Sequence, residues 1–181
     1  MKYLFASDIH GSAYYCQKLM DCYQESGADK LILLGDLLYH GPRNDLPKEY
    51  NPKRVIALLN EKKEEILAVR GNCDGEVDQM VLEFPILSDY SLLYEGKTEF
   101  FLTHGHHFSP ENLPPCRIGS VFVYGHTHIW RAERRDGIIL LNPGSVSIPK
   151  NGNPPTFAIY EQGMIFIQDF EGERLAQIQV L

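Results

Sequence analysis

The sequence predicts a protein of the α/β class, with a parallel sheet in its first half and antiparallel or mixed strands in its second. The first 70 residues alternate short apolar runs with helical segments, which is the pattern of parallel strands joined by crossover helices. The later residues carry short apolar runs with turn-rich connections, which favour antiparallel or mixed pairing. No internal repeat, low-complexity tract or linker interrupts the sequence, so we expect a single domain over residues 1–181.

In the first half, each predicted strand is a short apolar run that stops at polar or glycine residues. These strands are expected over residues 2–7, 31–34 and 66–69. One helix follows Ser12, whose hydroxyl can cap it, and runs to about Ser26, where Gly27 can stop it. A second helix has Pro52 in its first turn and runs to about Lys63.

The second half contains more strands and no strong helical signal. Six strands are expected, over residues 92–94, 99–103, 121–124, 138–141, 157–160 and 164–170. Earlier in the chain, residues 41–47 are rich in proline, glycine and asparagine and predict a loop after the second strand.

The bulk composition is that of a globular protein. The chain is 44% hydrophobic and 23% charged, and no apolar run approaches the roughly 20 residues needed to span a bilayer. Its first residues turn polar too soon for the apolar core of a signal peptide, so we expect a cytoplasmic protein without membrane association. The formal charge of −7 argues against stable nucleic-acid binding, which needs a basic face. The four cysteines show no paired metal-binding spacing, so free thiols are expected.

Polar side chains gather at the points where apolar strands end. Seven residues of this kind are Asp8, His10, Asp36, Asn72, His104, His126 and His128. Residues two apart in extended chain point the same way, so the Asp-x-His and His-x-His pairs can each present both side chains together. Because ligands bind at the carboxyl ends of parallel strands, we expect all seven to converge at one edge.

Four histidines, two aspartates and one asparagine at one edge predict a metal site. Seven ligands are too many for one tetrahedral ion and suit two ions with open positions. The mixture of imidazole and carboxylate favours Mn, Fe, Zn or Ni over calcium. Any one of these short motifs alone could be a cap or an ordinary turn, whereas five in this order, each after a strand, indicate a site.

The five motifs are Asp8-Ile9-His10, Gly35-Asp36, Gly71-Asn72-Cys73-Asp74, Thr103-His104-Gly105-His106 and Gly125-His126-Thr127-His128. Together they resemble the calcineurin-like metallophosphoesterase family. Three further stretches resemble its small prokaryotic phosphodiesterase branch: residues 41–44 (Gly-Pro-Arg-Asn), 142–145 (Asn-Pro-Gly-Ser) and 146–150 (Val-Ser-Ile-Pro-Lys). The resemblance covers essentially the whole chain. It implies the metallo-dependent phosphatase fold, a four-layer α/β/β/α sandwich in which two mixed β-sheets face each other between helices.

The resemblance also implies how the ligands would divide between two divalent ions, with Mn²⁺ expected. One ion would be held by Asp8, His10, Asp36 and His128. The other would be held by Asp36, Asn72, His104 and His126, so Asp36 would bridge the two ions. With a bridging hydroxide as nucleophile, the ions, aspartates and hydroxide leave a charge of about +1 to meet an anionic diester. Asp36, Asn72 and His104 are therefore predicted to be catalytic as well as metal-binding.

Cys73 departs from the family pattern. Many relatives carry histidine at this position, with the role of protonating the leaving oxygen. A thiol with an ordinary pKa of about 8.5 is a poor substitute for imidazole, so poor leaving groups are expected to react slowly. We treat Cys73 as a catalytic candidate, with His106 and His107 as alternative proton donors.

Arg43 and Asn44 are predicted to bind the substrate. They lie in the loop after the second strand, and arginine makes two-point contacts with phosphate oxygens. The alternative is a solvated arginine paired with Asp45.

The predicted function is a phosphodiesterase acting on a small-molecule phosphodiester. A phosphomonoesterase uses the same metal chemistry and differs in pocket shape. A non-catalytic metal-binding scaffold is the alternative from another functional class. A nuclease is disfavoured, because the sequence has no basic, aromatic-interleaved extension to hold a strand. The natural substrate, the physiological metal and the formation of a homo-oligomer stay open.

Overall fold

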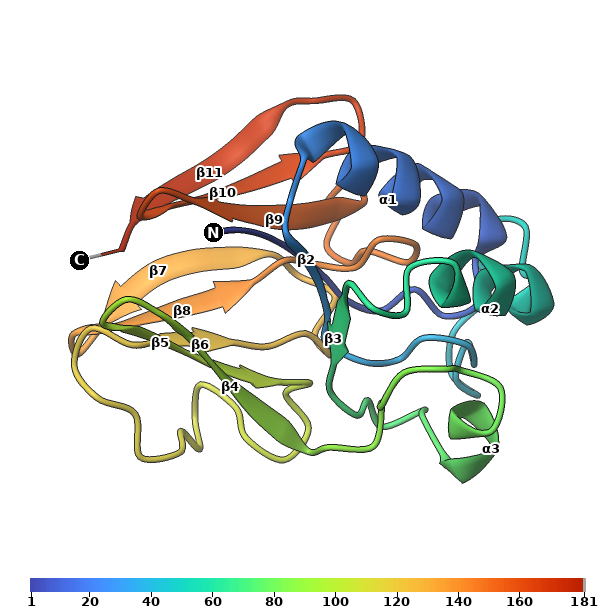
Figure 1. Cartoon of the computed structure of the whole chain (residues 1–181), viewed down its shortest axis with the longest axis horizontal. Helices are drawn as coiled ribbons and strands as arrows, with labels where there is room; N and C mark the ends of the chain where they lie inside the picture. The colour runs from blue at the N-terminus through green and yellow to red at the C-terminus, as the bar shows by residue number, and fades with distance from the viewer. Residues whose placement is uncertain (181) are drawn as a thin grey trace.

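The computed structural model describes residues 1–180, which form two β-sheets packed face to face (Figure 1). The strands of the first sheet, in spatial order, are β11 (Arg174–Gln179), β10 (Met164–Asp169), β9 (Thr156–Glu161), β1 (Lys2–Ala6), β2 (Lys30–Leu33) and β3 (Ile66–Ala68). Those of the second are β4 (Tyr90–Glu95), β5 (Thr98–Thr103), β6 (Val121–Val123), β8 (Ile138–Asn142) and β7 (Arg131–Arg135). The prediction of two facing sheets is confirmed.

Both sheets are mixed, and each has a parallel block. In the first sheet β1, β2 and β3 run parallel, while β9, β10 and β11 are antiparallel. In the second sheet β5, β6 and β8 run parallel between two antiparallel edge strands, β4 and β7. The carboxyl ends of the parallel strands are where the predicted ligands follow.

Two helices cover the outer face of the first sheet, α1 (Ala13–Ser26) and α2 (Pro52–Asn60) (Figure 1). The Ser12 hydroxyl accepts a hydrogen bond from the Tyr15 N–H, and Gly27 ends α1 with a φ of 63°, as the sequence predicts. The second helix ends at Asn60, three residues before the expected end, and the chain continues in turns.

The outer face of the second sheet is covered by segment 104–120, in which no helix forms. Phe108, Leu113 and Cys116 from this segment pack against buried residues of the sheet, among them Phe101 and Phe122. The fourth layer of the sandwich is therefore a loop.

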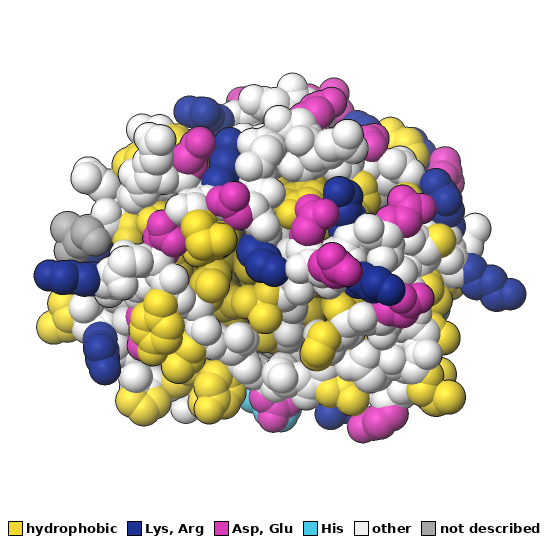
Figure 2. Space-filling model, in the orientation of Figure 1, with side chains coloured by type: hydrophobic (Ala, Val, Ile, Leu, Met, Phe, Trp, Pro, Cys, Tyr) yellow, Lys and Arg dark blue, Asp and Glu magenta, His cyan; other side chains and the backbone are white. Residues whose placement is uncertain are grey.

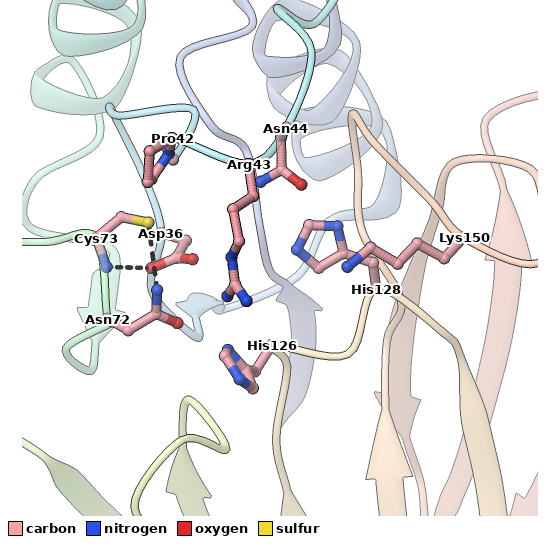
Figure 3. A pocket seen from close by; sticks show the side chains of 10 residues that line it. Asp36, Pro42, Arg43, Asn44, Asn72, Cys73, His126, His128 and Lys150 are labelled. Atoms are coloured by element: carbon pink, nitrogen blue, oxygen red, sulfur yellow. Dashed lines mark hydrogen bonds between the residues drawn. The ribbon is translucent and has the colours of Figure 1, made fainter.

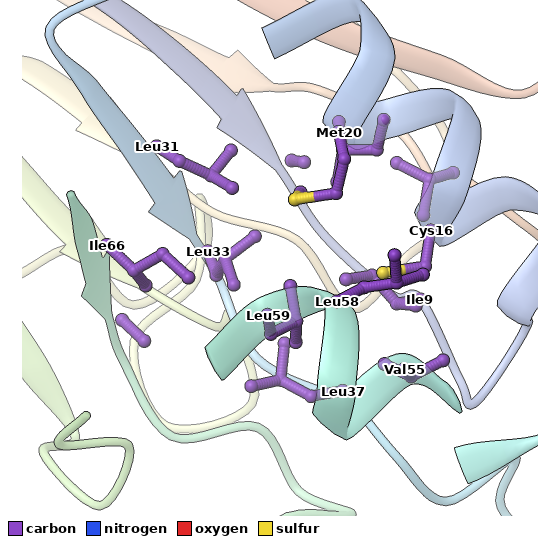
Figure 4. Packing of buried hydrophobic residues seen from close by; sticks show 14 of the residues in the cluster. Ile9, Cys16, Met20, Leu31, Leu33, Leu37, Val55, Leu58, Leu59 and Ile66 are labelled. Atoms are coloured by element: carbon purple, nitrogen blue, oxygen red, sulfur yellow. The ribbon is translucent and has the colours of Figure 1, made fainter. Parts of the chain in front are cut away.

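The core has two main layers, because residues of the first sheet alternate between its faces. Leu4 and Ala6 of β1 face the helices and join a cluster with residues of α1 and α2. Figure 4 shows part of this cluster. Tyr3 and Phe5 face the second sheet instead. Strands buried on both sides read as continuous apolar runs, which is why β1, β2 and β3 were predictable.

An aromatic cluster joins the two sheets. Phe100 of β5 lies with its ring centroid 6.0 Å from that of Tyr3, 5.9 Å from Phe5 and 5.0 Å from Tyr160. Tyr3, Phe5 and Tyr160 all belong to the first sheet. Phe100 is fully buried, so its side chain is a principal contact between the sheets.

Three short elements were not predicted from the sequence: β7, β11 and α3 (Glu76–Gln79). Both β7 and β11 are edge strands with exposed residues, so they carry charged and polar side chains in place of an apolar run. The four-residue α3 depends on a local contact, in which the Asp78 carboxylate accepts from the Gly75 N–H.

The edge strand β4 exposes apolar side chains. Tyr90, Leu92 and Tyr94 alternate along β4 and are 44–54% exposed, and Figure 2 shows hydrophobic side chains gathered over this region at the lower left. Within residues 1–180, no helix is both long and apolar enough to cross a membrane.

We expect Phe100→Ala to lower the free energy of unfolding by about 3–5 kcal/mol, because it removes a fully buried ring and leaves a cavity between the sheets. Urea denaturation followed by circular dichroism measures this change. Val77→Ala, at a side chain that is 75% exposed, is the control and should stay within about 0.5 kcal/mol of the wild type. Equal effects of the two substitutions would contradict the assigned role of Phe100.

Candidate metal centre

The seven predicted ligands meet at one rim of the sandwich. Asp8 and His10 follow β1, Asp36 follows β2 and Asn72 follows β3. His104 follows β5, and His126 and His128 follow β6. Asp8, His10, Asp36, His104 and His128 are buried, His126 is half-buried and Asn72 is exposed. The predicted convergence is therefore present in the structure.

The backbone at five of these residues is left-handed, which non-glycine residues rarely adopt. Positive φ values occur at Asp8 (58°), His10 (50°), Asp36 (56°), His126 (65°) and His128 (60°). Neighbouring loops hold this conformation, since the Asp8 N–H donates to the Gly35 carbonyl and the His10 N–H donates to the Asp36 carbonyl. Backbone of this kind costs free energy and persists where surrounding structure enforces it, typically at functional sites.

Three of the imidazoles are oriented by backbone carbonyl groups. His10 Nδ1 lies 2.7 Å from Tyr39 O, His104 Nδ1 lies 2.6 Å from Leu34 O, and His128 Nδ1 lies 2.8 Å from Ile148 O. A carbonyl can only accept, so each Nδ1 carries a hydrogen. In the neutral ring, each Nε2 then offers a lone pair, which is the arrangement typical of metal-binding histidines.

One group of ligand atoms comprises Asp8, His10 and His128. His128 Nε2 lies 3.3 Å from His10 Nε2 and 3.2 Å from Asp8 Oδ1. Two neutral Nε2 atoms repel at this distance unless a proton or a metal cation lies between them. Asp8 Oδ1 is buried and has no hydrogen-bond partner within residues 1–180. These orphaned lone pairs fit a bound divalent cation.

A second group centres on His104. Its Nε2 lies 3.0 Å from Asn72 Oδ1 and 3.3 Å from His126 Nδ1. Asp36 Oδ2 lies 3.5 Å from His104 Nε2 and 3.6 Å from His10 Nε2. Asp36 is therefore situated between the two groups.

In the metal-free cluster, neighbouring aspartate and histidine side chains shift one another's pKa values. Burial alone would raise the pKa of Asp8, but the neighbouring imidazoles of His10 and His128 hold it well below its usual value. Burial alone would lower the pKa of His104, but Asp36 and Asp8 raise it to about 9. Burial, together with the charge of His104, lowers the pKa of His126.

Asp74 positions the loops that carry two of the ligands, a role that was not predicted. Its buried carboxylate accepts hydrogen bonds from the backbone N–H groups of Asp36 (2.8 Å), Leu37 (2.9 Å) and Gly71 (2.7 Å). A Cβ at Gly71 would collide with the Asp36 backbone nitrogen. Asp74 thus joins the loops after β2 and β3. The sequence signal for this role is an acidic residue directly after a glycine-flanked ligand motif.

Side chains of residues 142–147 hold the backbone beside two of the predicted ligands. The Asn142 side-chain amide donates to the Gly125 carbonyl at 2.8 Å, and the Ser145 hydroxyl donates to the Asp8 carbonyl at 2.8 Å. Ser147 donates to the same carbonyl at 3.1 Å. The sequence identified this stretch only by its resemblance to known proteins, whereas the contacts show that it holds the backbone beside two ligands.

A cavity of about 330 Å³ opens onto the ligand cluster (Figure 3). It is lined by Asp36, Gly41, Pro42, Arg43, Asn44, Asn72, Cys73, His126, His128 and Lys150. Both predicted substrate-binding residues, Arg43 and Asn44, lie at this cavity. In the sequence, Lys150 belongs to the stretch 146–150 that resembles the phosphodiesterase branch, and nothing there indicates its position at the cavity.

Cys73 contacts the ligand residues directly. Its backbone N–H donates to Asp36 Oδ1 at 2.8 Å, and its sulfur accepts from Asn72 Nδ2 at 3.3 Å (Figure 3). Burial, followed by the neighbouring Asp36, raises the pKa of the thiol to about 12. The thiol therefore stays protonated at neutral pH. His106 packs against His104 and His126 and does not line the cavity.

Comparison with known proteins gives a consistent result. The family model described as the calcineurin-like phosphoesterase superfamily domain matches residues 1–163. The chain is 50% identical over 167 residues to the phosphodiesterase YfcE of Escherichia coli strain K12, covering 92% of this chain and 91% of that protein. It is 27% identical over 151 residues to the phosphodiesterase MJ0936 of Methanocaldococcus jannaschii, covering 80% and 83%.

Solved structures agree in fold. The structure of YfcE, described as a phosphoesterase from E. coli, superposes with a TM-score of 0.99 at 47% identity over the full length of both chains. The Vps29 protein of Entamoeba histolytica, solved with zinc, superposes with a TM-score of 0.67 at 19% identity over the full length of both chains. The second match supports the fold alone.

We expect Asp74→Asn to weaken metal binding by about 10–100-fold, because an amide nitrogen would face N–H donors and release the two ligand loops. Elemental analysis after dialysis against graded chelator concentrations measures this loss. Glu76→Gln, at an exposed side chain in the same segment, is the matched control. Retention of metal by Asp74→Asn at the level of this control would contradict the positioning role.

The metal-free protein should lose stability as the pH rises from about 6.5 to about 9. The pKa of His104 is raised from 6.5 to about 9 in the folded state, so its contribution is complete below about 6.5 and is lost as the pH approaches 9. Denaturation in chelator at several pH values measures this slope, and His104→Gln should flatten it. A wild-type slope equal to that of His104→Gln would contradict the assignment.

Proposed function

This chain belongs to the calcineurin-like phosphoesterase superfamily, and on that premise we propose that it hydrolyses small phosphodiesters with two divalent ions, of which Mn²⁺ is the preferred one. The observation that carries the proposal is the ligand cluster at the cavity floor, with three imidazoles fixed by backbone carbonyls so that their Nε2 atoms converge. Fifty per cent identity to a protein named as a phosphodiesterase supports the diester as substrate. The chain is accordingly a phosphoric diester hydrolase.

The proposed ligand division follows the two groups of atoms. Asp8, His10 and His128 would hold one ion, and Asn72, His104 and His126 would hold the other. Asp36 would be shared, since its Oδ2 is nearly equidistant from His10 Nε2 and His104 Nε2. Mn²⁺ suits this mixture of imidazole, carboxylate and amide oxygen, while Fe, Zn and Ni remain alternatives.

Divalent ions bound here would supply Lewis-acid chemistry, lowering the pKa of a coordinated water and offsetting charge on the phosphoryl oxygens. The chain's own residues bind and orient the substrate. The Arg43 guanidinium points into the cavity (Figure 3), where it can donate two hydrogen bonds to non-bridging phosphoryl oxygens. The Asn44 amide donates to the His40 carbonyl at 2.8 Å, which orders the loop that carries Arg43.

The leaving oxygen needs a proton when it is a poor leaving group. A thiol with a pKa of about 12 is a weak acid for this purpose, so we propose that Cys73 orients Asp36 through its backbone N–H and supplies little acid catalysis. The enzyme would then favour diesters with good leaving groups. Cytoplasmic location stays a prediction, and the formation of a homo-oligomer stays open.

Removal of metal by a chelator should abolish hydrolysis of bis(4-nitrophenyl) phosphate, and Mn²⁺ should restore it better than other divalent ions. The restored enzyme should hydrolyse this diester faster than 4-nitrophenyl phosphate. Asp36→Asn should lower the rate more than Asn72→Ala does and reduce the metal content at both positions. Faster turnover of the monoester would favour a phosphomonoesterase, and full activity in protein shown to be metal-free would refute the proposal.

A further inference from the structure

Two cationic side chains enter the cavity from different loops. Arg43 belongs to the loop that follows β2, and Lys150 belongs to the segment that follows β8. Figure 3 shows Arg43 extending toward His126, while Lys150 reaches past His128 from the other side. The two charges therefore border different parts of the same cavity.

Both side chains stand on anchored backbone. The Lys150 N–H donates to the His128 carbonyl at 3.1 Å, and the Asn153 side-chain amide donates to the Lys150 carbonyl at 2.9 Å. On the other side, Asn44 ties the Arg43 loop to the His40 carbonyl. The backbone that carries each cation is thus held beside the ligand cluster by contacts of its own segment.

Neither cation has an acidic partner. Across residues 1–180, neither the Arg43 guanidinium nor the Lys150 ammonium group forms an ion pair. Asp36 is the one acidic residue in the cavity lining, and it is a proposed metal ligand. In a chain with a net charge of −7, two unpaired cations at one cavity indicate a complementary anion.

A simple phosphodiester carries a single negative charge, which the proposed ions and Arg43 already offset. We propose that the cavity selects phosphodiesters that bear a second anionic group, with Lys150 binding that group while Arg43 binds the scissile phosphoryl group. This inference rests on the proposed phosphodiester hydrolysis. The planar guanidinium suits two-point contact with phosphoryl oxygens, and the flexible ammonium suits a carboxylate or phosphate whose position varies.

The test compares esters that differ only in the second charge. The substrates are 4-nitrophenyl diesters whose other ester group is 3-carboxyphenyl or 4-carboxyphenyl, each paired with its neutral carboxamide. All four release 4-nitrophenolate. With the Mn²⁺-loaded enzyme, we expect kcat/KM for at least one carboxylate ester to exceed that for its carboxamide by about 5-fold, the upper range for an exposed ion pair.

Lys150→Gln should remove this preference by lowering kcat/KM for the carboxylate ester about 5-fold more than for the carboxamide. Lys97→Gln changes the net charge equally but lies before the first residue of β5, at the opposite end of that strand from His104, so it should keep the preference. Calorimetry measures binding of the monoester product, 4-carboxyphenyl or 3-carboxyphenyl phosphate, without turnover. Lys150→Gln should bind this product more weakly than the wild type, and Lys97→Gln should bind it as the wild type does.

The outcomes separate this inference from the proposed function. Equal kcat/KM for every carboxylate and carboxamide pair, or an equal loss for both in Lys150→Gln, would overturn the inference and leave diester hydrolysis intact. A loss of preference in Lys97→Gln as well would attribute it to net charge and would also overturn the inference. Hydrolysis of none of the four esters, with 4-nitrophenyl phosphate turned over, would overturn the proposed function itself.

Discussion

The hydrogen bond between His104 Nδ1 and the Leu34 carbonyl joins the two sheets at the rim where the ligands gather. His104 follows a strand of the second sheet, and Leu34 follows a strand of the first. The bond therefore aligns the sheets at this rim and leaves Nε2 of His104 facing Asn72 and Asp36. Four residues earlier, Phe100 packs among aromatic residues of the opposite sheet and maintains the spacing that this bond requires. Sheet packing and ligand geometry are thus coupled.

The ligand loops combine local strain with close backbone approach. Left-handed backbone at five ligand residues is unfavourable for L-amino acids, and Asp74, Asn142 and Ser145 supply the hydrogen bonds that hold it. Glycine at position 125 leaves room for Ser7, since a Cβ there would collide with the Ser7 hydroxyl. The free energy gained by folding the whole sandwich thus offsets the cost of left-handed backbone at a few residues of one rim.

The charges are arranged in two layers. The carboxylates of Asp8 and Asp36 lie at the buried floor among imidazoles, and Arg43 and Lys150 stand at the more exposed wall. Divalent cations at the floor would neutralise the carboxylates, so an anionic substrate would meet positive charge at the floor and beside Arg43 and Lys150. A net acidic chain can therefore attract an anionic substrate locally, because nearby charges dominate the field inside a cavity.

The sequence alone determined the elements with strong local signals and the set of polar residues that gather at one rim. Three features were predictable: the apolar runs of β1, β2 and β3, the Ser12 cap and Gly27 stop of α1, and the seven metal-binding candidates. Strand burial, helix capping and ligand chemistry each depend on residues that are close together in the sequence. Edge strands such as β11 were not, because an exposed strand needs no apolar pattern.

Only the tertiary structure decided which residues support and complete the site. Asp74 accepts from backbone groups 37 and 38 positions earlier, and a carboxylate gives no sequence signal of which N–H groups it will meet. Lys150 lies beside His128 because its backbone is bound to that residue. Segment 104–120 covers the second sheet without forming a helix. Each of these features depends on contacts between segments far apart in the chain, which local propensity and spacing do not contain.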